Sequence, residues 1–137
     1  MNIIEALEKK RDDFYKIRDI SIQQEELLSN EELDEFLSLW EKRELIRKEI
    51  DSDQKKYRSA LERADKKERE MAVSLNREIS EVIESIMAVD KRVEELVREK
   101  REVFLCDIKG LKKGRTAVKS YGNKKGLAYS RFIKTIG

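Results

Sequence analysis

The stretch KKEREMAVSLNREISEVIESIMAVDKRVEELVREKREV, residues 66–103, decides the fold of this chain. Its apolar residues recur at alternating spacings of three and four, the pattern of a helix whose one face is buried in a coiled coil or bundle. The positions on this face are Ala72, Leu75, Ile79, Val82, Ile86, Val89, Val93, Leu96, Lys100 and Val103. The stretch therefore predicts one long helix, in which Lys100 interrupts an otherwise apolar face.

The start of this helix is marked by Asp65 and by Glu68 three residues later. The pair resembles a capping box, in which each side chain accepts a hydrogen bond from the other residue's backbone N–H. The chain has five glycines and no proline, and every glycine lies after Lys109. Because glycine and proline are the residues that most disfavour helices, residues 1–109 can form long ones.

Two further helices are predicted before this one, over about residues 2–28 and 31–64. Ser29 or Asn30 is expected to cap the second, with Glu31 and Glu32 near its positive N-terminus. The first helix has Ile3, Leu7, Phe14, Ile17 and Leu28 on one face, which Lys10, Ser21 and Gln24 interrupt. The second has Leu33, Phe36, Leu37, Trp40, Ile46, Ile50, Tyr57, Leu61 and Ala64, interrupted by Arg43, Arg47 and Asp53.

These elements predict an all-α protein, an antiparallel three-helix bundle or coiled coil, since short connections make successive helices antiparallel neighbours. The third helix is expected to cover residues 66–121 and to extend past the other two from about Arg101. Residues 1–122 then form one helical domain, and residues 123–137 form a flexible basic tail.

Charge is distributed unevenly along the 137 residues, although the net charge is only +2. From Lys109 onward there are nine Lys or Arg residues and no Asp or Glu. The first 108 residues carry 22 basic and 29 acidic side chains, a net charge of −7. The chain is therefore an acidic body followed by a basic C-terminal segment.

The composition argues against several classes of protein. The chain has no histidine and one cysteine, Cys106, which excludes Ser-His and Cys-His nucleophiles and an intramolecular disulfide. Without histidine or paired cysteines, neither a metal nor another cofactor is expected, and the chain is predicted not to be an enzyme. No apolar run is long enough to span a membrane and no Sec-type signal peptide is visible, so a cytoplasmic protein is expected.

The C-terminal segment is the predicted contact with a partner. Its apolar residues recur at helical spacing among lysines, which suits a helix that docks into a partner's groove while its charges set register. The predicted binding residues are Phe104, Leu105, Ile108, Leu111, Lys112, Lys113, Arg115, Val118 and Tyr121. Two alternatives remain open: nucleic-acid binding through the basic tail, which the acidic body disfavours, and self-association, as a homodimer or scaffold, through the face from Leu75 to Leu96.

Two stretches resemble a known family, the flagellar type III export chaperones of the FlgN and FliT type. The stretch EFLSLWEKRELIRKEID resembles the family's second helix, and LKKGRTAVKSYG followed by SRFIKTIG is similar to a C-terminal segment of FlgN-like members. The matching positions are Leu37, Trp40, Lys42, Arg43, Glu44, Leu45, Ile46 and Ile50, then Gly114, Arg115, Ala117, Tyr121 and Phe132.

The resemblance implies a small cytoplasmic chaperone, with the FlgN type favoured by length. Such a chaperone binds the C-terminal helix of a late flagellar subunit, either a hook–filament junction protein or the filament cap. It prevents premature assembly and aids delivery to the export apparatus. The family's contacts tend to lie in the C-terminal helix, where the predicted binding residues are found.

Overall fold

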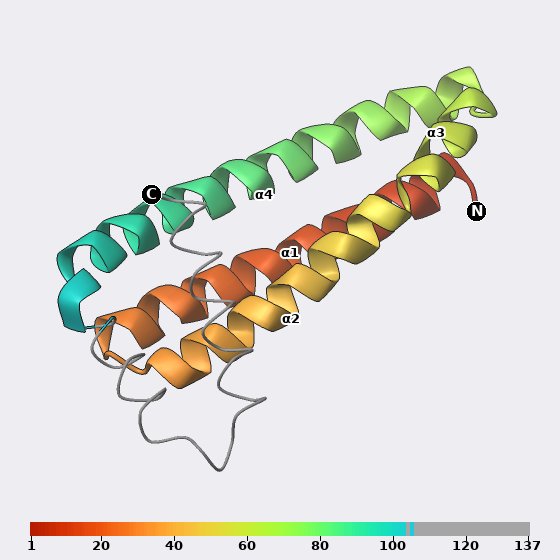
Figure 1. Ribbon diagram of the computed structural model, residues 1–137. Coiled ribbons are helices and arrows are strands. Elements are labelled where there is room, and N and C mark those ends of the chain that lie inside the picture. The colour runs from red at the N-terminus through yellow and green to blue at the C-terminus, as the bar shows by residue number, and fades with distance from the viewer. Residues whose placement is uncertain (104, 106–137) are drawn as a thin grey trace, which may run out of the picture.

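A computed structural model describes residues 1–103 and residue 105 of the chain. This part is all-α and contains no strand. Its helices are α1 (Ile3–Ser29), α2 (Leu33–Ser52), α3 (Gln54–Glu62) and α4 (Lys66–Glu99). At 1.5 Å per residue, α1 is about 40 Å and α4 about 51 Å long. Figure 1 shows α1 and α4 running in one direction, with α2 and α3 returning in the other, so the helices form a bundle.

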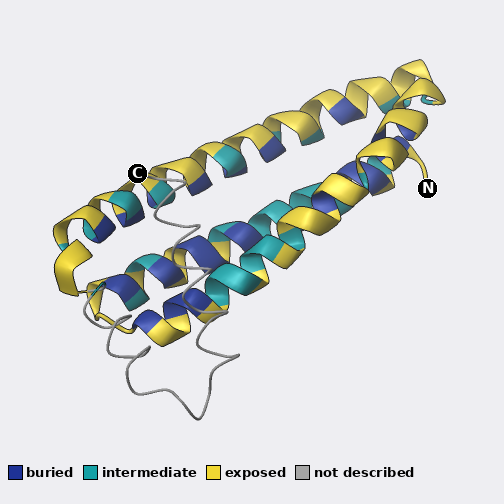
Figure 2. Cartoon of the chain, viewed as in Figure 1, coloured by how far each residue is buried: buried dark blue, intermediate teal, exposed yellow. Residues whose placement is uncertain are grey.

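The start of α4 and its buried face agree with the sequence pattern. The Glu68 N–H donates to Asp65 Oδ1 at 2.8 Å and the Asp65 N–H to Glu68 Oε1 at 3.3 Å, which makes the predicted capping box. The buried residues of α4 are Ala72, Ile79, Val82, Ile86, Val89, Val93 and Val97. Leu75 is half-buried, and towards the C-terminus Val97 takes the buried position expected of Leu96. Figure 2 shows this face turned towards α1.

The second predicted helix is divided into α2 and α3 by a turn at Asp53. The break contains neither glycine nor proline. Instead, the Asp53 carboxylate reaches across to α1, where it accepts a hydrogen bond from Lys9 Nζ at 2.6 Å. Aspartate is a weak helix former whose side chain competes for polar partners outside the helix, so it suits this break. Beyond the break Leu61 is 48% exposed, although the spacing assigned it to the core.

The connection between α1 and α2 also differs from the prediction. Ser29 and Asn30 do not cap α2: Ser29 is the last residue of α1, and Asn30 is its C-cap. Glu31 follows with a φ of 58°, in the left-handed region. The N–H of Glu31 donates to Leu28 O and that of Glu32 to Leu27 O, at 3.0 and 2.8 Å. This is a Schellman motif, which satisfies the last carbonyls of α1.

The core consists of three apolar clusters spaced along the bundle. The cluster at the C-terminal ends of α1 and α4, the acidic-end cluster, contains Leu28, Leu33, Phe36, Leu37, Val89, Val93 and Val97. The middle cluster contains Ile17, Ile50, Val82 and Ile86. The cluster near the turn between α3 and α4, the turn-end cluster, contains Ile3, Leu7, Ala60, Ala72 and Ile79. Trp40, expected in the core, lies half-buried against the acidic-end cluster.

The third predicted helix does not pass through Lys100 without interruption. α4 ends at Glu99, and Lys100 is its C-cap with a φ of −103° and a ψ of 13°. Lys100 Nζ donates to the carbonyls of Leu28 and Ser29, at 3.5 and 3.1 Å, so the lysine on the apolar face serves the end of α1. The rest of the predicted helix, from 106 to 121, and the predicted tail 123–137 lie outside the described residues.

Candidate functional site at the acidic end

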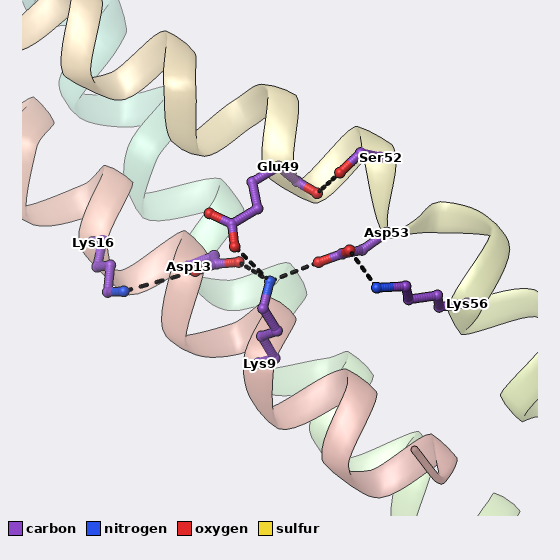
Figure 3. Close-up of polar contacts among 7 residues, drawn as sticks. All are labelled: Lys9, Asp13, Lys16, Glu49, Ser52, Asp53 and Lys56. Carbon is purple, nitrogen blue, oxygen red and sulfur yellow. Dashed lines mark hydrogen bonds and ion pairs between the residues drawn. The ribbon is translucent and has the colours of Figure 1, made fainter.

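Two polar clusters separate the apolar clusters, and the first is centred on Lys9. Figure 3 shows the Lys9 ammonium between three carboxylates, with Nζ 3.4 Å from Asp13, 3.0 Å from Glu49 and 2.6 Å from Asp53. The hydrogen bond to Asp53 and the one to Glu49 raise the pKa of Lys9 well above its usual value. The same ammonium lowers the pKa of Asp53. This Lys9 cluster joins α1 to the junction of α2 and α3 between the turn-end and middle clusters.

The second polar cluster is centred on Arg43 and lies between the middle and acidic-end clusters. The Arg43 guanidinium of α2 donates through both terminal nitrogens to Asp90 of α4, with Nη1 2.8 Å from Oδ1. Nη1 also donates to Gln24 Oε1 of α1 at 3.3 Å. The guanidinium carbon lies 5.3 Å from the centre of the Trp40 ring, in range of a cation–π contact. Arg43, which interrupts an apolar face in the sequence, thus connects three helices.

The bundle has a distinctly acidic end, where α1 and α4 finish and α2 begins. Residues 25–35 carry six Asp or Glu side chains and no Lys or Arg. Because α1 and α4 are parallel, both of their C-termini lie at this end, and each adds the negative end of a helix dipole. The last turn of α1 has no basic residue to offset it. The acidic end therefore attracts cationic groups.

A shallow groove of about 620 Å³ runs between α1 and α4 at this acidic end. Its lining residues are Ile22, Glu25, Glu26, Ser29, Asn30, Arg92, Glu95, Leu96 and Glu99. Arg92 is paired with Glu25, with Nε 2.6 Å from Oε2. Within residues 1–103, the carboxylates of Glu26, Glu95 and Glu99 have no ion-pair partner. The groove thus offers three unpaired carboxylates beside an apolar surface that includes Ile22, which is 48% exposed.

The predicted binding residues fall almost wholly outside the described part of the chain. Phe104, Ile108, Leu111, Lys112, Lys113, Arg115, Val118 and Tyr121 all lie there. Leu105 is described: it is half-buried and packs against the acidic-end cluster. Leu105 thus contacts the bundle, although the third helix was expected to extend past the other two from about Arg101. The neighbouring Val103 is 44% exposed.

The sequence did not reveal the groove, because its acidic residues belong to two helices that are far apart in the chain. Glu95 and Glu99 are one turn apart on α4, and Glu26 lies on α1, so neither stretch forms a recognisable motif alone. A signal was present nonetheless. Residues 25–35 carry six acidic side chains and no basic one, whereas the segment from Lys109 onward carries nine basic side chains and no acidic one.

Comparison with known proteins gives no further assignment: no family model matches the chain, and neither does any curated protein or solved structure. In the described residues, no helix combines the length and apolar character needed to cross a bilayer. The same residues contain no group of three or more Asp, Glu or Cys side chains placed to hold a metal ion.

Proposed function

We propose that this protein is a cytoplasmic flagellar type III export chaperone, of the FlgN type in preference to the FliT type. In this proposal it binds the C-terminal helix of a late flagellar subunit, a hook–filament junction protein or the filament cap. It prevents that subunit from assembling early and aids its delivery to the export apparatus.

One observation carries the proposal: a long helical body precedes a C-terminal segment that is basic and also apolar at helical spacing. A body of this kind suits a small binding protein, since its polar clusters are engaged in ion pairs that join helices. The resemblance of residues 35–51, 111–122 and 130–137 to the chaperone family supplies the identity of the client.

The finer arrangement belongs to the same proposal. The helices act as an antiparallel three-helix platform, and the chain beyond α4 carries the contact surface into a flexible basic tail. Ile108, Leu111 and Val118 insert into the client, with Phe104 beside them and Leu105 shared with the core. Lys112, Lys113 and Arg115 attract acidic groups of the client and set its register.

Self-association through the face from Leu75 to Leu96 is less favoured. Ile79, Val82 and Ile86 on this face are each at most 6% exposed, because side chains of α1, α2 and α3 already pack against them. A scaffold that used this face would have to open the bundle first. Nucleic-acid binding remains the other candidate, with the basic segment as its contact.

The proposal is tested by calorimetric titration of the full chain with a peptide of the client's C-terminal helix. We expect Ile108→Asp/Leu111→Asp to weaken binding about 100-fold or more, because each buried aliphatic side chain contributes about 1.5–3 kcal/mol. The matched control is Leu45→Asp/Met87→Asp, which places two carboxylates at body positions that are 67% and 64% exposed.

The control should bind the peptide like the unmodified chain. Equal affinity for all three proteins would overturn the proposed contact, provided that each gives the same helical circular dichroism. Binding of a DNA or RNA oligonucleotide that falls steeply with salt, with no binding of the peptide, would favour the nucleic-acid alternative.

A further inference from the structure

The groove at the acidic end has the properties of a binding site for cations on a peptide. Three of its carboxylates, those of Glu26, Glu95 and Glu99, have no ion-pair partner among residues 1–103, and they lie beside the exposed side of Ile22. The negative ends of two parallel helices add to their field. We propose that this groove binds the chain's own basic C-terminal segment, residues 109–125.

Charge complementarity is the first argument. Residues 109–125 contain seven Lys or Arg side chains and no Asp or Glu. The same segment carries Leu111, Val118 and Tyr121, which can cover Ile22 and Leu96 while the lysines meet the carboxylates. A segment that is both basic and apolar thus matches a groove that is both acidic and apolar.

The path of the chain is the second argument. Lys100 Nζ already lies on the carbonyl of Ser29, and Ser29 lines the groove. The chain therefore leaves α4 beside the site. Lys109 follows Leu105 by four residues, a distance of at most about 14 Å for an extended chain. A tether this short raises the local concentration of the segment to about the millimolar range, which favours contact within one molecule over contact between two.

Lys100 shows that this end of the bundle can bind a lysine ammonium group. Its ammonium is held by two carbonyls at the end of α1 and by the Glu31 carboxylate at 3.4 Å. The acidic end thus already binds one lysine of the segment that follows α4. The inference does not depend on the identity of the client, because it concerns only groups within this chain.

The test is paramagnetic broadening in the full chain. The only cysteine is replaced by Cys106→Ser, and a nitroxide is attached through Ser120→Cys in the middle of the basic segment. We expect loss of amide signal at Ile22, Glu26 and Glu95. We expect none at Val73, which lies about 33 Å from Glu95 along α4. Raising salt from 0.1 to 1 M, which shortens the screening length from about 10 to about 3 Å, should restore the lost signals.

Two variants locate the contact. In the nitroxide-labelled chain, Glu26→Gln/Glu95→Gln should abolish the broadening. Glu81→Gln/Glu84→Gln, which removes the same charge from exposed positions of α4 outside the groove, should leave it unchanged. Broadening that is absent at 0.1 M salt, or that persists in the groove variant, overturns the proposal.

The remaining outcome concerns a second copy of the chain. Protein labelled with ¹⁵N but without a nitroxide is mixed with ¹⁴N protein that carries the nitroxide, so that only contacts between molecules broaden the signals. No broadening is expected in this mixture. Broadening at the groove residues would show that the segment binds another molecule, and it would overturn the intramolecular site.

Discussion

At the scale of the residue, Lys9 shows how one ammonium can fix the meeting point of two helices. It gathers Asp13 from its own helix and Glu49 and Asp53 from the end of α2. Asp53 has only 13% of its side chain exposed, so its charge depends on this partner. Tyr57 lies buried one turn further on, where burial raises its hydroxyl pKa. The pair of Lys9 and Asp53 therefore makes stability depend on pH.

The prediction follows from the lowered pKa of Asp53. A carboxyl group whose pKa is lowered by folding stabilises the native state above its unfolded pKa of 3.8, and this stabilisation is lost as pH falls through the folded-state value. We expect Asp53→Asn to be less stable than the unmodified chain at pH 6. The difference should shrink steadily below pH 3.8. Urea unfolding between pH 6 and 2 measures it.

Asp51→Asn is the control, because Asp51 is 67% exposed and pairs, in the described part of the chain, with Arg47, which is also exposed. The Asp51→Asn substitution should change the free energy of unfolding little at pH 6 and at pH 2. A difference between Asp53→Asn and the unmodified chain that stays constant from pH 6 to 2 would show that the Lys9 pair does not cause the effect.

At the scale of the element, the end of α1 is held by a backbone motif that a glycine would normally supply. Glu31 adopts a φ of 58°, where a side chain with a Cβ costs about 1–2 kcal/mol. The motif is retained because it satisfies the carbonyls of Leu27 and Leu28, and because Glu31 also pairs with Lys100 at 3.4 Å. The hydrogen bonds that satisfy the end of α1 thus offset the backbone strain at Glu31.

We expect Glu31→Gly to stabilise the fold by about 0.5–1 kcal/mol, since the relief of strain exceeds the small contribution of an exposed ion pair. Glu32→Gly is the matched control. Glu32 has a φ of −86°, which any residue adopts, so glycine there should destabilise by up to about 1 kcal/mol through added freedom in the unfolded chain. Chemical denaturation of the two variants checks this, and equal effects would contradict the account.

At the scale of the whole molecule, apolar and polar clusters alternate along the bundle. The Lys9 cluster lies between the turn-end cluster and the middle one, both of which Phe14 contacts, and the Arg43 cluster lies between the middle and the acidic-end one. A helix shifted by one turn would place Arg43 or Asp90 against apolar side chains. Because an unpaired buried charge is costly, the two polar clusters fix the register of the helices.

We therefore expect Arg43→Ala to destabilise the fold by about 2–4 kcal/mol, because it leaves Asp90 and Gln24 without their donor. The Arg43 side chain is only 14% exposed, whereas that of Arg47, one turn away, is 53% exposed. Arg47→Ala should cost less than about 1 kcal/mol. Urea unfolding followed by circular dichroism and by Trp40 fluorescence compares the two, and similar losses would refute the assigned role of Arg43.

Much of the fold could be predicted because α4 follows its sequence pattern closely. Its capping box at Asp65 and its buried positions from Ala72 to Val93 depend on local spacing and hydrogen bonding. Ser21 and Gln24 were less predictable. They interrupt the apolar face of α1 in the sequence, yet they are 0% and 1% exposed. Polar residues at such positions are buried when another helix brings a partner or when packing encloses them.

Less of the candidate site than of the fold could be predicted from the sequence. The sequence located the basic, apolar segment after Lys109 and the acidic character of the body. It did not locate the groove, since Glu26 and Glu95 belong to helices far apart in the chain. A groove between two helices exists only after the helices have packed, so no local pattern could reveal it.

The sequence by itself determined the all-α class, the long α4 with its start at Asp65, and the separation of an acidic body from a basic segment. These follow from helical periodicity, capping and composition, which act over a few residues. The tertiary structure decided the break at Asp53, the capping of α1 by Lys100 and the acidic groove. Each depends on the approach of groups from different helices, because charges and backbone carbonyls choose their partners only once packing has brought them within hydrogen-bonding distance.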